Sequence, residues 1–209
     1  MEVEVSESML NEVKAVMSDI KNGYKNVLVT SINKTLTTTK VQSAARIGNE
    51  INLKAARIKQ NLTVQKANYA KISGALVSKG EPIGLINFGA RSVLKGVTVQ
   101  VLRAEPRGLL KHAYIATGRG STKQHVFWRA DRNKMPAAKK FPVGKKSKAP
   151  WPSFGDKYRM PAERLTGPRI EDIFAKNKVM EPVMIQANHL FLANVDAKIT
   201  DVLRRHASG

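Results

Sequence analysis

The most informative stretch of the chain is Glu81-Pro-Ile-Gly-Leu-Ile-Asn-Phe-Gly-Ala-Arg91, which continues through Lys95-Gly-Val-Thr-Val-Gln-Val-Leu-Arg103. Its first half holds a proline and two glycines, which predict a bent entry segment and then a tight turn. In its second half Val97, Val99 and Val101 alternate with polar residues, which is the period of a half-buried strand. We therefore expect a strand over 96–103 at a sheet edge that carries Arg91, Lys95 and Arg103.

Further strands are predicted on both sides of this stretch. Residues 64–77 alternate with a period of two and read as one strand. Residues 109–117 and 125–130 read as a hairpin joined by the polar segment 118–123, which would place His112 across from His125. Together these segments predict one small antiparallel sheet of about four strands.

Helical patterns occupy the two ends of the chain. Apolar residues at helical spacing predict helices over 6–22, 24–49 and about 53–60, although the threonine-rich run 35–39 weakens the middle of the second. A short helix near residue 170 and a longer one that opens at Pro182 follow, because proline suits the first turn. The expected fold is α+β: a single domain over 1–209, with helices in 1–62, the sheet in 63–131, an extended arm in 132–158, and C-terminal helices in 159–209 packed on the sheet.

The charge of the chain is large and unevenly distributed. The 209 residues hold 36 Lys and Arg against 16 Asp and Glu, a formal net charge of +20. Residues 24–170 carry +23, whereas residues 1–23 carry −3 and residues 171–209 are neutral. A polycation of this kind attracts polyanions such as nucleic acid, acidic protein surfaces or anionic lipid.

The most basic segment lies within the predicted arm. Residues 132–155 contain four prolines and no acidic residue. Aromatic residues interrupt the segment at Phe141, Trp151 and Phe154, so we expect it to dock on a partner or on its own domain. Its lysines would neutralise phosphates without reading sequence, or would face an acidic protein ring; a solvated charge run is the plainer alternative. These lysines are Lys134, Lys139, Lys140, Lys145, Lys146 and Lys148.

Several kinds of chemistry are not indicated by the sequence. The absence of cysteine excludes disulfides and thiolate ligands, and the four histidines have no partner at metal-ligand spacing. The glycine-rich segment 118–123 lacks the order of a phosphate-binding loop, since a strand rather than a helix follows it. No nucleophile signature occurs, and no secretory or membrane-spanning pattern is present. We expect a soluble protein that is not an enzyme, with no cofactor, no metal, no small-molecule substrate and no membrane partner.

Four pieces of the sequence carry a resemblance to a known family. Ile83–Arg91 with Lys95–Val101 resembles the minor tail protein Z family of tailed phages and prophages, typified by phage lambda. The segments His112–Thr117, Val126–Arg129 and Arg159–Pro168 are similar to further family motifs in order and spacing. The resemblance covers roughly residues 25–205 of the chain.

The resemblance implies a structural virion protein, a tail-completion or neck component at the head-proximal end of the tail, made in the host cytoplasm. It implies a ring of identical subunits, most simply a hexamer, beside a tail terminator, tail tube or connector, and near the genomic DNA end. The alternative is a basic, sequence-nonspecific nucleic-acid-binding protein of ribosomal or nucleoid type; an enzyme of unknown chemistry is a weaker third class. The candidate contact residues are Arg91, Lys95, Arg103, Arg119, Lys123, Lys139, Lys140, Lys145, Lys146 and Lys148.

Overall fold

The computed structural model describes residues 2–3, 5–18, 20–118, 122–129 and 162–207. Helices and short antiparallel strands within these ranges confirm the α+β class. The chain divides into two compact units: a helical unit, Met1–Glu81 with Pro168–Gly209, and a β unit, Pro82–Gly167. The expected arm, residues 132–158, lies outside the described ranges. No helix in the described ranges is long and apolar enough to cross a membrane.

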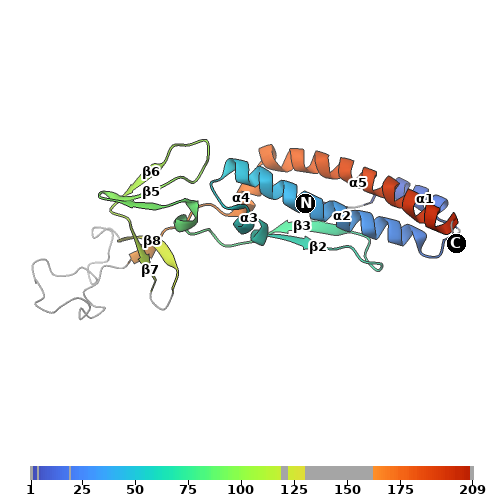
Figure 1. The fold of residues 1–209 in the computed structure, drawn as a ribbon, viewed down its shortest axis with the longest axis horizontal. Helices are drawn as coiled ribbons and strands as arrows, with labels where there is room; N and C mark the ends of the chain where they lie inside the picture. Colours follow the sequence, from blue (N-terminus) through green and yellow to red (C-terminus); the bar gives the residue numbers. More distant parts are fainter. Residues whose placement is uncertain (1, 4, 19, 119–121, 130–161, 208–209) are drawn as a thin grey trace, which may run out of the picture. The chain divides into compact units, whose positions relative to one another are not determined.

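Two long helices form the centre of the helical unit. Helix α2 (Gly23–Glu50) and helix α5 (Asn177–Ala207) lie side by side (Figure 1). Helix α2 buries apolar side chains along its length, among them Leu28, Ile32, Leu36 and Ile47, each 0% exposed. The prediction that the C-terminal helices pack on the sheet is therefore wrong for α5, which packs along α2. The side chains that α5 buries recur every four residues: Val179, Val183, Ala187, Phe191 and Val195.

Small polar side chains line part of the contact between α2 and α5. Ser31, Thr35, Thr39 and Ser43 are spaced by four residues and all are buried. The Ser31 hydroxyl donates to the backbone carbonyl oxygen of Asn194 at 3.0 Å, and the Asn194 side-chain amide donates to Thr35 Oγ1 at 3.0 Å. These hydrogen bonds offset the cost of burying polar groups. Tertiary contacts thus keep the threonine-rich run helical, against its weak intrinsic preference.

The remaining helices are short, and two predicted boundaries are wrong. Helix α1 (Glu7–Val16) is capped by Ser6 and ends well before residue 22, where the predicted helix ended. Helix α3 (Ala55–Asn61) and helix α4 (Ile170–Phe174) lie where they were predicted. Helix α5 begins before Pro182, which lies in its second turn, because the Lys176 carbonyl oxygen already accepts the N–H groups of Val179 and Met180.

The strand predicted over 64–77 is two strands joined by a loop. Strands β2 (Leu62–Gln65) and β3 (Gly74–Ser78) pair antiparallel, and β1 (Glu2–Val3) pairs with the other edge of β3. The chain reverses near Asn68, whose side-chain oxygen accepts the N–H groups of Ala70 at 3.0 Å and Lys71 at 2.7 Å. Asn33 of α2 fixes the loop, since its side-chain amide exchanges two hydrogen bonds with the Ala67 backbone.

The β unit contains two more three-stranded sheets. One has the order β4 (Arg91–Val93), β5 (Gly96–Val99), β6 (Gly108–Lys111); the other has the order β7 (Tyr114–Thr117), β8 (Gln124–Arg129), β9 (Ala162–Arg164). The short 3-10 helix η1 (Leu85–Phe88) contacts β5 and β8. The single sheet of about four strands is therefore replaced by three small sheets in the described residues. The core of the β unit is small and includes Ile83, Phe88, Val97 and Val126, each at most 1% exposed.

The predicted single strand over 109–117 is wrong, because this segment forms two strands, β6 and β7. The chain breaks it at His112, whose φ of 62° lies in the left-handed region, so that β6 and β7 belong to different sheets. The register of β7 and β8 places Ala116, not His112, opposite His125. Sequence alternation does not reveal this break, because residues on both sides of it retain a strand-like pattern.

Candidate functional site

The candidate site is built around the hairpin of β4 and β5. Val93 pairs with Gly96, so Leu94 and Lys95 form a two-residue turn at the tip. Gly96 has a φ of 147°, and a Cβ atom at this position would lie 2.0 Å from the Leu110 carbonyl oxygen. Only glycine fits such a close approach of two backbones. The glycine that the sequence places after Lys95 therefore allows β5 to pair closely with β6.

The neighbouring turn after β6 completes the site. Gly96 pairs with Lys111, and the N–H group of His112 donates to the Lys95 carbonyl oxygen at 3.1 Å. The left-handed conformation of His112 is unusual for a residue other than glycine and turns the chain sharply away from β6. The backbone thus fixes Lys95 beside the end of β6.

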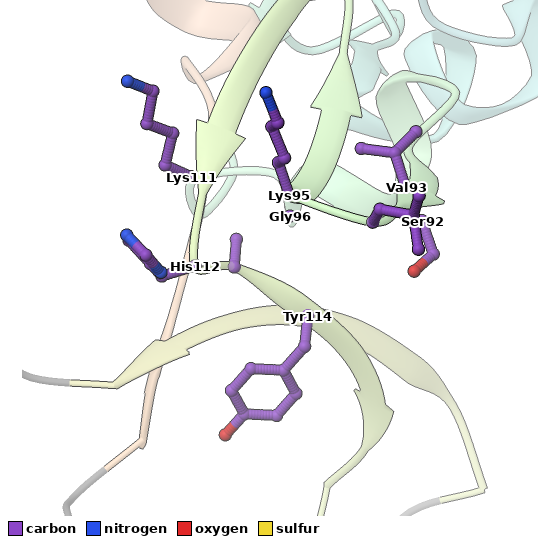
Figure 2. A pocket seen from close by; sticks show the side chains of 9 residues that line it. Ser92, Val93, Lys95, Gly96, Lys111, His112 and Tyr114 are labelled. Atoms are coloured by element: carbon purple, nitrogen blue, oxygen red, sulfur yellow. The ribbon is translucent and has the colours of Figure 1, made fainter.

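An open groove of about 660 Å³ lies between these two turns. In Figure 2 the side chains of Lys95 and Lys111 extend toward the same side, whereas the Tyr114 ring extends away from them. The groove carries two ammonium groups and one imidazole, and no carboxylate is among its lining residues. Its lining residues are Ser92, Val93, Leu94, Lys95, Gly96, Lys111, His112, Ala113 and Tyr114.

The chemistry available in this groove is recognition of an anion rather than a reaction. The lysine and histidine side chains can donate hydrogen bonds to phosphate or carboxylate oxygens. Leu94, fully exposed at the tip of the hairpin, adds an apolar contact. Within the described residues no group of three His, Asp or Glu side chains is arranged to hold a metal ion.

The predicted contact residues are distributed over several places in the β unit. Lys95 lines the groove, whereas Arg91 is exposed on β4, Arg103 is exposed after β5, and Lys123 is exposed just before β8. The structure thus brings Lys95 together with none of the other predicted residues in this groove. The other predicted residues lie outside the described ranges: Arg119, Lys139, Lys140, Lys145, Lys146 and Lys148.

The sequence interpretation missed Lys111 and His112 as members of the site. It placed both inside one continuous strand, where alternation would send them to opposite faces. The signal that could have identified them is the polar Lys-His pair between two apolar segments, which permits a turn. The left-handed conformation at His112 has no clear sequence marker.

One basic residue of the β unit has a structural role instead. The Arg107 guanidinium donates to the Gly89 carbonyl oxygen and to the Thr98 carbonyl oxygen, the second at 3.3 Å. It therefore links the turn after η1 to strand β5. A positive charge in this unit is not by itself evidence of a ligand contact.

Comparisons of the chain with protein-family models, with curated proteins and with solved structures give no match.

Proposed function

We propose that the chain is a structural protein of a tailed phage particle, a tail-completion or neck component that holds the DNA end through the cationic surface of its β unit. The observation that carries the proposal is the concentration of charge in this unit. Residues 82–167 contain 18 basic and 4 acidic residues, so they hold +14 of the total charge of +20. The remaining 123 residues carry only +6.

The groove beside Lys95 supports contact with phosphate. Two lysines and a histidine border it without a competing carboxylate. Phosphate contacts of this kind are independent of base sequence, which suits a protein that receives one DNA end after another. In the assembled tail we expect a ring of identical subunits, most simply six, that contacts a tail terminator, tail tube or connector.

The resemblance described above supports the assembly part of the proposal. Its most specific motif, Ile83–Arg91 with Lys95–Val101, builds η1, β4 and β5, and so includes the turn that carries Lys95. The motif thus lies in the unit that holds most of the charge. The runner-up function, a ribosomal or nucleoid type of nucleic-acid-binding protein, shares the charge but predicts no dependence on tail proteins.

Binding of duplex DNA tests the contact part. We expect the full-length protein to bind a labelled duplex strongly at low salt, and the double variant Lys95→Gln, Lys111→Gln to bind about tenfold more weakly with a salt slope smaller by about 1–2. The matched control is Lys54→Gln, Lys59→Gln, which removes two exposed lysines from the helical unit. Equal losses in both double variants would sink the assignment to the groove.

Particle assembly tests the other part. A phage that lacks the protein should yield tails that do not join to DNA-filled heads, as counted by electron microscopy and plaque titre. Full-length, joined and infectious particles without the protein would rule out the assembly role and leave the runner-up function.

A further inference from the structure

A second surface of the β unit is formed by one face of the sheet β7-β8-β9. Side chains alternate between the faces of a sheet, and the register pairs Tyr114 with Phe127 and Ala116 with His125. These four side chains therefore share one face. Val126 and Trp128 belong to the opposite face of the same strand, where Val126 is fully buried in the core.

The Phe127 ring lies beside both other rings of this face, and all three residues are partly exposed. Tyr114 and Phe127 are stacked with ring centroids 6.0 Å apart and 29° between their planes. The imidazole of His125 meets the Phe127 ring edge-on at 6.1 Å. All three residues are of intermediate burial, so the other described residues do not fully cover this face. Ala116 lies opposite His125 and adds almost no bulk beside it.

The charge around these rings favours an anionic ligand. Arg164 of β9 pairs with Phe127 and is exposed. The neighbouring acidic residue, Glu163, pairs with Trp128 on the opposite face and accepts a hydrogen bond from its indole N–H at 3.0 Å. Among the described residues of the sheet, the face with the three rings therefore carries an arginine and no carboxylate.

We propose that this face is a stacking platform for unpaired bases of single-stranded nucleic acid. An exposed aromatic ring beside a cationic group is the combination that binds single strands without sequence preference, because every base has a flat face. Duplex DNA offers no such faces, since its bases are stacked on each other inside the helix. An uncharged apolar peptide would use the rings but would gain nothing from the net charge of +14 on this unit.

The platform shares only Tyr114 with the lysine groove and takes a different ligand. Figure 2 shows the Tyr114 ring directed away from Lys95 and Lys111, so one nucleic acid could place phosphates at the groove and unpaired bases at the rings. The inference rests on the proposed function only in assuming a nucleic-acid partner. It deepens that function, because it assigns the unpaired end of a strand to a definite surface.

Binding of full-length protein to a labelled thymidine oligonucleotide and to a labelled duplex tests the inference. The variant Phe127→Leu keeps apolar bulk but removes the ring that lies beside both Tyr114 and His125. We expect at least about a tenfold loss of affinity for the single strand and less than about a twofold change for the duplex. Trp128→Leu is the matched control, because it removes an exposed ring from the other face of β8 and should change neither affinity.

Three outcomes would overturn the platform: an unchanged single-strand affinity, an equal loss for both probes, or an equal single-strand loss in Trp128→Leu. Photo-crosslinking of the oligonucleotide to the unaltered protein gives a second reading that does not depend on the variant folding. Crosslinks at Tyr114 or Phe127 support the platform, and crosslinks only elsewhere contradict it. Duplex binding by the variant that lacks Lys95 and Lys111 tests the proposed function alone. Failure of the proposed function can therefore be distinguished from failure of the platform.

Discussion

The two units of this chain achieve stability in different ways. The helical unit buries long rows of side chains between α2 and α5 and can enclose polar groups such as Ser31 and Thr35. The β unit has a small apolar core around Phe88. Its turns are held by the close backbone approach at Gly96 and by hydrogen bonds from the Arg107 guanidinium to backbone carbonyl oxygens. The unit with most of the charge therefore has the smaller apolar interior to oppose charge repulsion.

The largest expected effect is in the core of the β unit. Phe88→Ala removes a fully buried ring and should cost about 3–5 kcal/mol, enough to unfold a small unit. The described residues of this unit contain no α-helix, so far-UV circular dichroism should retain its helical signal while duplex binding is lost.

The corresponding change in the helical unit is Leu36→Ala, which should cost about 2–5 kcal/mol and reduce the helical signal instead. Urea unfolding of both variants can be measured by circular dichroism and by duplex binding. If the two probes give one coincident transition in each variant, the helical unit and the β unit do not unfold independently, and the difference in how they are stabilised is not supported.

A medium effect is expected for the buried hydroxyl groups between α2 and α5. Thr35→Val leaves the Asn194 amide without its acceptor and should cost about 1–3 kcal/mol. Thr39 is the matched control, because its buried hydroxyl has no hydrogen-bond partner among the described residues. Thr39→Val should be neutral or stabilising by up to about 1 kcal/mol in urea denaturation. An equal loss in both variants would show that shape, not hydrogen bonding, decides this contact.

The smallest effect concerns the last turns of α5. The hydrogen bond from Lys198 lowers the pKa of Asp201, partial burial opposes the change, and the charge of Arg205 adds to it. A lowered pKa means that the folded state favours the ionised form of Asp201. The stabilisation that this carboxylate gives the folded state is therefore fully present above the pKa that Asp201 has in the unfolded chain. It is lost as the pH falls through the folded pKa.

The variant that tests this carboxylate is Asp201→Asn. It should lower the melting temperature slightly at neutral pH and not at all in strong acid. Thermal denaturation at several pH values measures the difference in melting temperature between this variant and the unaltered protein. A difference that is the same at neutral pH and in strong acid would contradict the ionic explanation.

Part of this architecture was predictable from the sequence because it depends on local pattern. The apolar spacing of α2 leads to its helix, and the alternation of Val97 and Val99 leads to strand β5. The same prediction was wrong in extending this strand to Arg103 and in placing it at a sheet edge, because β5 ends at Val99 and lies between β4 and β6. The reversal at Asn68 was missed, since a polar loop between two alternating segments keeps a period close to two. The aromatic face was missed because it depends on the register of Tyr114 with Phe127, which the break at His112 decides.

The side chain of Asn194 has a consequence for how α5 can move. The apolar row on α5 repeats every four residues, so a slip of one helical turn would place Val183 where Val179 was. Such a slip moves the helix about 5.4 Å, and apolar contacts alone would resist it weakly. It would, however, separate the Asn194 side-chain amide from Thr35 Oγ1 and leave buried polar groups without partners. One asparagine side chain therefore selects a single register of α5 against α2, and the two helices cannot slide past each other without a cost.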